Sequence, residues 1–188
     1  MKVKEGAIMK ILKNELKSNL NLRTQKNFPV DGVEFIDITP LILQKEVFDE
    51  ITEKFVEKIK GIDVDYLVLP EARGFLFGSA VAKEVGAGIV PVRKKGKLPP
   101  DYVAKTFTYE KEYGKDILEL PKLVDGEYDG KKFYIIDDIY ATGNTIKAIS
   151  KSIEELSGIV VGVGVVMNIP ALNSDKNIFS LIDIEETN

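Results

Sequence analysis

The sequence contains no histidine, cysteine or tryptophan, and these absences narrow the chemistry that it can perform. Without cysteine it has no disulfides, thiolate metal ligands or cysteine nucleophiles, which agrees with a cytoplasmic location. Without histidine, serine–histidine–aspartate catalysis is excluded, and zinc loses its preferred nitrogen ligands as well as its sulfur ligands. Any metal should therefore be a hard cation on oxygen ligands, Mg²⁺ first. Any general acid or base should be Asp, Glu, Lys or Tyr.

The chain also lacks long apolar runs and an excess of positive charge. No segment approaches the roughly 20 apolar residues of a membrane span, and the N-terminus does not have the pattern of a signal peptide. Lys and Arg number 26 against 30 Asp and Glu, which gives a net charge of −4 and disfavours a general affinity for nucleic acid. The 188 residues are 44% hydrophobic, which predicts one soluble domain with a substantial core.

Short apolar runs alternate with amphipathic stretches along the chain. Continuous apolar strands alternating with helices predict an α/β fold: a central, mostly parallel sheet flanked by helices. The expected strands are 66–69, 89–92, 133–136, 159–167 and 178–184, and the expected helices are 5–20, 45–60, 75–85 and one that carries Ile146, Ile149 and Ile153. Residues 21–40 read as mostly irregular chain, and 101–120 as an extended hairpin or a mobile loop.

The most informative stretch runs from Lys132 to Ile149. Two carboxylates, Asp137 and Asp138, stand where a buried strand is expected to end, and a hydroxyl-rich turn then leads into a helix with Thr145 as its expected N-cap. A helix N-terminus attracts phosphate, and the carboxylates could hold sugar hydroxyls or a hard cation. An acid pair alone is often only a turn, but this order of strand, acids, turn and helix suits a phosphosugar.

Two other segments also follow expected strands. Glu71-Ala72-Arg73-Gly74 combines a guanidinium, which binds anions through a bidentate fork, with a glycine that permits close backbone approach. The segment from Arg93 to Lys97 carries four cationic side chains. Taken in isolation, the first is more often a salt bridge at a strand end and the second a solvated surface. Because parallel strands place their carboxyl ends at one edge, these loops should converge with Asp137 and Asp138.

These segments resemble known sequences. The strand, acid pair and A-T-G-N-T turn resemble the signature of the type I phosphoribosyltransferases. The blocks L-P-E-A-R-G-F-L-F-G, V-P-V-R-K-K-G-K-L-P, E-Y-G-K-D-I-L-E and F-I-D-I-T-P are similar to blocks of the adenine phosphoribosyltransferases. They occur in the family's order and spread over residues 32–145, so the resemblance covers most of the chain.

The resemblance implies a purine salvage enzyme that converts adenine and phosphoribosyl pyrophosphate (PRPP) to AMP and pyrophosphate. It implies Mg²⁺ as cofactor, held mainly through PRPP with Asp137 and Asp138 nearby, and a homodimer that binds neither nucleic acid nor membrane. It also implies one phosphoribosyltransferase domain over 1–188. In that domain about 1–40 would form a helix and a base-binding hood, and about 41–188 the PRPP-binding core.

The resemblance also assigns roles to residues. It assigns the 5-phosphate of PRPP to Ala141, Thr142, Gly143, Asn144 and Thr145, and its ribose hydroxyls to Asp137 and Asp138. It assigns the pyrophosphate to Glu71, Ala72, Arg73, Gly74, Arg93 and Lys97, and the base to Glu34, Phe35 and Ile36. It places Tyr109, Glu112 and Tyr113 on a flexible loop that closes over the site. Catalysis would fall to Arg73, Asp137, Asp138 and Glu112, with Glu112 handling the proton of the purine.

The sequence departs from the family's pattern at three positions. Asn144 stands where the phosphate turn has its second Gly, although Asn tolerates left-handed backbone angles. Ile36 replaces a usual Arg, and Glu34 occupies a usually apolar position, which leaves guanine or hypoxanthine open as the base. A regulator that binds PRPP without catalysis is a further alternative. It would need a separate DNA-binding domain, and the acidic composition disfavours DNA contact.

Overall fold

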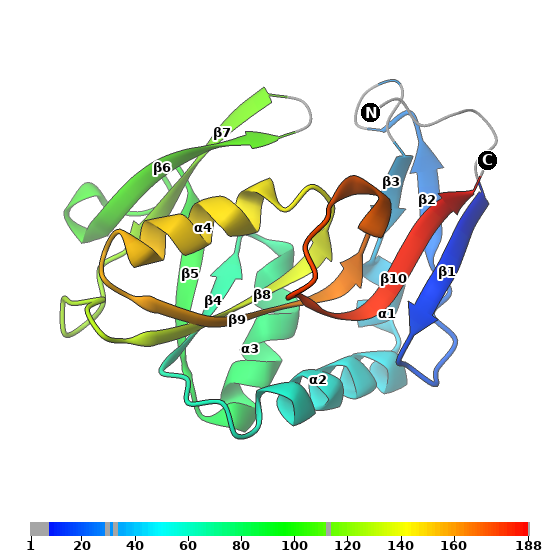
Figure 1. The fold of residues 1–188 in the computed structure, drawn as a ribbon, viewed down its shortest axis with the longest axis horizontal. Coiled ribbons are helices and arrows are strands. Elements are labelled where there is room, and N and C mark those ends of the chain that lie inside the picture. Colours follow the sequence, from blue (N-terminus) through cyan, green and yellow to red (C-terminus); the bar gives the residue numbers. More distant parts are fainter. Residues whose placement is uncertain (1–7, 29–30, 32–33, 112–113, 188) are drawn as a thin grey trace.

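The protein, seen here as a computed structural model, is described at residues 8–28, 31, 34–111 and 114–187 (Figure 1). Its main sheet has the strand order β1-β10-β9-β8-β4-β5-β7-β6. In that order the strands are Ile8–Asn14, Phe179–Thr187, Ile159–Asn168, Lys132–Tyr140, Tyr66–Pro70, Gly88–Lys94, Gly114–Pro121 and Val103–Lys111. The central strands β10, β9, β8, β4 and β5 run parallel, whereas β1 and the β6–β7 hairpin are antiparallel additions at the two edges. This confirms the α/β class.

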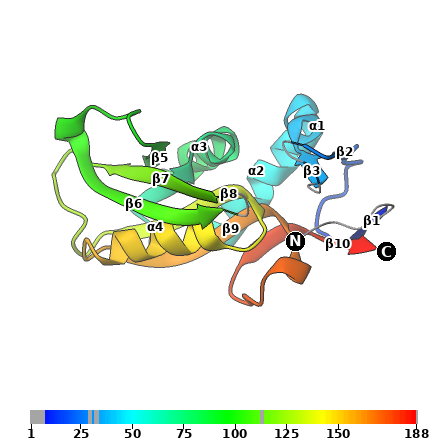
Figure 2. The same cartoon turned by 90° about the horizontal axis from the view of Figure 1, so that it is seen from above.

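Helices cover both faces of the sheet. They are α1 (Thr39–Leu43), α2 (Lys45–Ile59), α3 (Arg73–Val85) and α4 (Asn144–Glu154), with short 3-10 turns η1 (Pro100–Tyr102) and η2 (Pro170–Leu172). Figure 2 shows α4 on one side of the central strands and α2 and α3 on the other. Because successive strand residues point to opposite faces, Leu67 and Leu69 pack in the cluster that includes α2 and α3, while Val68 packs in the cluster of α4. Within the part of the chain that the structure describes, no helix has the length and apolar character needed to cross a bilayer.

The N-terminal segment differs from the prediction. Residues 8–14, expected to be helical, form β1, which pairs antiparallel with β10. The apolar spacing that suggested a helix is divided between two environments: Ile11 is 44% exposed on the strand, whereas Leu16 and Leu20 are buried beyond its end. The partner strand lies at the other end of the sequence, so local periodicity could not reveal it.

Residues 21–40 are more regular than expected. Strands β2 (Arg23–Lys26) and β3 (Glu34–Asp37) pair as a separate antiparallel ribbon, which α1 follows directly. Figures 1 and 2 both place this ribbon at the end of the molecule opposite the β6–β7 hairpin. All four residues of β2 are exposed, so the segment has no alternation of apolar and polar residues that would have predicted a strand.

The central elements agree with the predictions in type, with shifts at their ends. Strand β8 continues past Ile136, because Asp137 still pairs with Val165 and Tyr140 with Asn168 of β9. The two acids therefore lie within the strand and not after it. Residues 103–111 and 114–121 pair as the two strands of the β6–β7 hairpin, one of the two alternatives for that stretch.

Candidate active site

The carboxyl ends of β4, β5 and β8 lie at one edge of the sheet, and side chains from all three meet there. Arg73, the first residue of α3 after β4, places its Nε atom 2.9 Å from Oδ2 of Asp138 on β8. Glu71 accepts hydrogen bonds through Oε2 from Nε of Arg93 and from the backbone N–H of Lys94 at the end of β5, both at 2.9 Å. Two ion pairs thus link the three segments that the topology was expected to bring together.

The acid pair on β8 is buried. Asp137 and Asp138 are 8% and 4% exposed, and the backbone N–H of Asp138 donates to Oδ1 of Asp137 at 2.9 Å. Burial and then the neighbouring Asp138 carboxylate raise the pKa of Asp137 well above its ordinary value. Despite the nearby Arg73, Oδ2 of Asp138 accepts no hydrogen bond from the described residues. The Arg73 guanidinium balances the charge of this oxygen, and a ligand that brings a hydroxyl or a cation would supply the hydrogen bond or coordination that it lacks.

The turn between β8 and α4 is built around Gly143. This residue has φ +80° and is the N-cap of α4, so the prediction of Thr145 as N-cap is wrong; Thr145 is the second residue of the helix. A Cβ atom at Gly143 would lie 2.1 Å from the hydroxyl oxygen of Tyr140, which leaves room only for glycine. No side chain caps the helix, so its first N–H groups remain available to an anion.

Asn144 does not have the strained backbone considered in the sequence analysis. It is the first residue of α4, and it is not among the described residues with positive φ. The left-handed conformation falls on Gly143 alone. The departure from the family's Gly-Gly pattern therefore carries no backbone cost at this position.

The loop at residues 71–74 combines a salt bridge with a close helix–strand contact. The N–H of Lys94, followed by Arg93, holds the pKa of Glu71 below its ordinary value, and the peptide bond between Glu71 and Ala72 is cis. Arg73 and Gly74 belong to the first turn of α3. A Cβ atom at Gly74 would lie 3.0 Å from the carbonyl oxygen of Ile136, so glycine here allows α3 to approach β8.

Lys97 lies apart from these contacts. It is exposed in the turn after β5, where its backbone N–H donates to the carbonyl of Lys94 at 3.1 Å. Its side chain forms no hydrogen bond or ion pair with the rest of the described chain. The structure thus brings Arg73 and Arg93 into the ion-paired cluster and leaves Lys97 on the surface beside it.

The β2–β3 ribbon reaches the cluster through Phe35. The guanidinium carbon of Arg73 lies 5.7 Å from the centre of the Phe35 ring, and the ring of Phe28 meets Phe35 edge-on at 5.1 Å. Ile36, next along the strand, is 8% exposed and packs in the core. For Glu34 only the backbone is described, paired with Lys26.

Of the three residues assigned to the flexible loop, the structure describes one. Tyr109 lies in β6 opposite Asp116 and is 8% exposed, so it is a buried strand residue and not part of a loop. Glu112 and Tyr113 lie outside the described residues.

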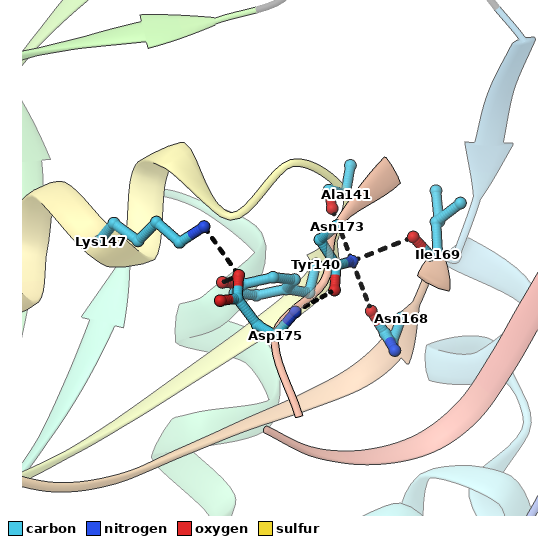
Figure 3. Close-up of polar contacts among 7 residues, drawn as sticks. All are labelled: Tyr140, Ala141, Lys147, Asn168, Ile169, Asn173 and Asp175. Carbon is cyan, nitrogen blue, oxygen red and sulfur yellow. Dashed lines mark hydrogen bonds and ion pairs between the residues drawn. The ribbon is translucent and has the colours of Figure 1, made fainter. Parts of the chain in front are cut away.

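A polar network beside the turn could not be predicted from the sequence. Figure 3 shows Asn173 and Asp175, just after η2, contacting Tyr140, Ala141 and Lys147 around the start of α4. The sequence around these residues is a short polar stretch, N-S-D-K-N, with no periodicity or motif. Only the fold brings it to the 141–145 turn.

The site offers oxygen ligands but no complete metal cage. Among the residues that the structure describes, no group of three or more acidic side chains could hold a metal ion. The two buried acids therefore suit a cation that arrives with further ligands of its own.

An uncapped helix N-terminus beside two buried acids, at the carboxyl edge of a parallel sheet, is the arrangement expected of a protein that binds a phosphorylated ligand. Residues 41–187 match the family described as the phosphoribosyl transferase domain, and the chain belongs to that family. Its relatives include an adenine phosphoribosyltransferase of Clostridium acetobutylicum, 46% identical over 153 residues that cover 81% of this chain and 87% of the relative.

Solved structures of similar proteins support the same fold. An adenine phosphoribosyltransferase from Thermoanaerobacter pseudethanolicus is 39% identical with a TM-score of 0.78, over 86% of this chain and 95% of its own. The enzyme from Saccharomyces cerevisiae, solved in complex with adenine and an imino-altritol bisphosphate, is 35% identical with a TM-score of 0.74, over 86% and 94%.

Proposed function

We propose that this chain transfers the phosphoribosyl group of PRPP to adenine, giving AMP and pyrophosphate in purine salvage. The observation that carries the proposal is the similarity to adenine phosphoribosyltransferases over most of both chains. The placement of Arg73, Asp138 and the 141–145 turn at one edge of the sheet supports it, because a substrate with phosphates at both ends needs anion-binding groups on both sides of a sugar site.

PRPP extends along this edge in the proposal. The 5-phosphate binds the first N–H groups of α4 and the 141–145 turn, and the ribose hydroxyls bind Asp137 and Asp138. The pyrophosphate binds on the side of Arg73, with Glu71, Ala72 and Gly74 forming the loop beneath it. Arg93 and Lys97 add positive charge. Residues 41–187 thus form the PRPP-binding core, and the β2–β3 ribbon forms the base-binding hood.

In the reaction, the bond from the ribosyl carbon to pyrophosphate breaks and a bond to the purine nitrogen forms. The sugar becomes cationic in between, so the chain's contribution is chiefly positioning and charge stabilisation. Asp137 and Asp138 place negative charge beside the sugar, and Arg73 places positive charge beside the leaving group. Glu112 takes the proton that the purine nitrogen loses.

Magnesium fits this site as an ion brought in by PRPP. The acid pair provides only oxygen atoms, and Oδ2 of Asp138 pairs with Arg73 but accepts no hydrogen bond within the described chain. Mg²⁺ held mainly through PRPP, near Asp137 and Asp138, would supply further positive charge to the departing pyrophosphate. A homodimer and a cytoplasmic location belong to the same proposal.

Adenine is the favoured base despite the substitution at position 36. Neighbouring residues of a strand face opposite sides. Ile36 is buried in the core, whereas the ring of Phe35 faces Arg73. The replacement of the family's Arg by Ile36 therefore lies on the face turned away from Phe35, where it does not alter the surface that would stack on the base.

The test is a purine panel. The protein is incubated with PRPP, Mg²⁺ and adenine, guanine or hypoxanthine, and pyrophosphate release is measured. Adenine should be the best substrate. Turnover with guanine or hypoxanthine but not adenine would overturn the choice of base, and binding of PRPP without turnover of any purine would identify a regulator.

A further inference from the structure

Asn173 holds the first peptide of the 141–145 turn. Its Nδ2 atom lies 2.9 Å from the carbonyl oxygen of Ala141, 3.0 Å from Oδ1 of Asn168 and 3.0 Å from the carbonyl oxygen of Ile169 (Figure 3). Its Oδ1 accepts from the backbone N–H of Asp175 at 3.3 Å. Three acceptors share two amide protons, so the donor capacity of Asn173 is fully used.

These contacts determine which way the turn's dipoles point. The Ala141 carbonyl is directed at Asn173, and the bond from Ala141 to Thr142 is trans, so the N–H of Thr142 points the opposite way. The preceding carbonyl, that of Tyr140, accepts from the N–H of Ile169 at 2.9 Å. The carbonyl oxygens of Tyr140 and Ala141, which would repel an anion, are thereby hydrogen-bonded to residues beside η2. The N–H of Thr142 points away from η2.

A second anchor holds the same turn through Asp175. Its Oδ2 accepts from the hydroxyl of Tyr140 at 2.8 Å and pairs with Nζ of Lys147 at 2.7 Å. Lys147 and then Tyr140 hold the pKa of Asp175 below its ordinary value. Because Gly143 lies against the Tyr140 side chain, this anchor bridges the strand end, the turn and the first turns of α4.

We propose that Asn173 is a positioning residue for the 5-phosphate, which keeps the 141–145 turn in its anion-binding conformation before the ligand arrives. It does not touch the phosphate; it acts through the Ala141 carbonyl. The proposal rests on the proposed function, since it takes this turn as the 5-phosphate site. Preorganising a turn improves binding because less conformational freedom is lost with the ligand.

The experiment measures binding at the two ends of PRPP separately. Asn173→Asp keeps the side chain's shape but turns a carboxylate toward three acceptors, and Asn173→Ala removes the donor altogether. Titration calorimetry with ribose 5-phosphate should show affinity about ten-fold weaker for both variants. Affinity for Mg-pyrophosphate should stay within about two-fold of the wild type, because that ligand binds at a separate group of residues. In steady-state assays KM for PRPP should rise while KM for adenine stays unchanged.

Two further variants act as controls. Asn177→Ala changes the same residue type in the same segment, at an exposed position whose side chain forms no hydrogen bond in the described chain, and it should leave both affinities unchanged. Gly143→Ala alters the turn itself and should weaken ribose 5-phosphate binding. If Asn173→Asp fails to fold, Asn173→Ala provides the same comparison.

The outcomes distinguish this inference from the proposed function. Unchanged ribose 5-phosphate affinity in the Asn173 variants, together with loss in Gly143→Ala, overturns the inference and leaves the function standing. Equal losses for ribose 5-phosphate and pyrophosphate also overturn it, since they indicate a merely structural role. A wild-type protein that releases no pyrophosphate from PRPP with any purine overturns the proposed function itself.

Discussion

Arg73 contacts two parts of the candidate site at once: its Nε atom lies 2.9 Å from Oδ2 of Asp138, and its guanidinium lies over the ring of Phe35. One side chain therefore joins the acid pair of β8 to the ribbon that forms the proposed base site. Because 42% of the Arg73 side chain is exposed, solvent screens the pair and limits what it adds to folding stability. The same exposure leaves the guanidinium accessible to a ligand.

Replacing Asp138 should affect activity more than folding. Asp138→Asn keeps the shape but removes the charge proposed to stabilise the cationic sugar, and it should lower turnover about 100-fold or more. The variant should still fold, because the remaining contacts of β8 are unchanged. Pyrophosphate release and thermal unfolding measure the two effects.

Asp63→Asn is the matched control for this prediction. The Asp63 carboxylate pairs with Lys132 at the opposite end of β8 and is 79% exposed. This variant should have wild-type turnover. Near-normal turnover in Asp138→Asn as well would remove the acid from the mechanism.

Asp137 should make stability fall with rising pH. Burial, and then Asp138, raise its pKa above the ordinary value of 3.8, so the folded state binds the proton more tightly than the unfolded state does. This contribution to stability is present below the unfolded pKa and is lost as the pH rises through the folded pKa. Asp137→Asn stays neutral, so its stability relative to the wild type should increase with pH, to a gain of at least about 1 kcal/mol at neutral pH.

Urea unfolding of both proteins from about pH 4 to about pH 8 measures this difference. Asp101→Asn, an exposed position in η1, controls for a general effect of removing one negative charge. A constant difference between Asp137→Asn and the wild type over the whole range would contradict the raised pKa.

Tyr134 has a hydroxyl without a partner in the core. It is 1% exposed, and its Oη atom forms no hydrogen bond with the described residues. Tyr134→Phe removes an unsatisfied polar group, so the free energy of unfolding should rise by about 1 kcal/mol. Turnover should not change, because the ring packs between the sheet and α2.

Tyr128→Phe is the opposite case. The Tyr128 hydroxyl is also buried, but it donates to the carbonyl of Pro121 at 2.8 Å. Its removal should lower the free energy of unfolding by about 1 kcal/mol. Urea denaturation that shows the two variants shifting in the same direction would rule out the explanation from hydrogen bonding.

Gly143→Ala and Gly61→Ala separate backbone strain from steric overlap. Both glycines have positive φ, but a Cβ atom at Gly61 meets nothing within 4 Å, whereas at Gly143 it overlaps Tyr140. Gly61→Ala should cost about 1 kcal/mol of stability, from the backbone alone. Gly143→Ala should cost about 1–3 kcal/mol more, because the turn must move. If thermal or urea unfolding shows equal losses of stability for the two variants, the turn accommodates the Cβ atom at position 143 without additional cost.

The central sheet and the meeting of its loops could be predicted because the necessary information is local. Each parallel strand is a continuous apolar run, and parallel strands direct their ends to one edge. Arg73 and Asp138 could therefore be expected near each other before any distance was known. The exact ends of β8 and α4 could not, since pairing with β9 continues through the acids and Gly143 caps the helix without a side-chain signal.

The parts that escaped prediction depend on partners far away in the sequence. Residues 8–14 carry apolar residues at helical spacing, yet they pair with β10. Asn173 and Asp175 lie in a polar stretch that resembles any loop, and their function arises from contacts with Ala141 and Tyr140. Neither hydrophobic period nor turn chemistry encodes such contacts.

The pairing of β1 with β10 has a consequence for biosynthesis. The register matches Ile8 with Thr187, so one edge of the sheet pairs the first and the last of the described strands to leave the ribosome. Until residues 179–187 have emerged, residues 8–14 are a strand without a neighbour, exposed to pairing with other chains. The edge of this sheet therefore closes last, after the phosphate turn and the core cluster around α4 have had time to form.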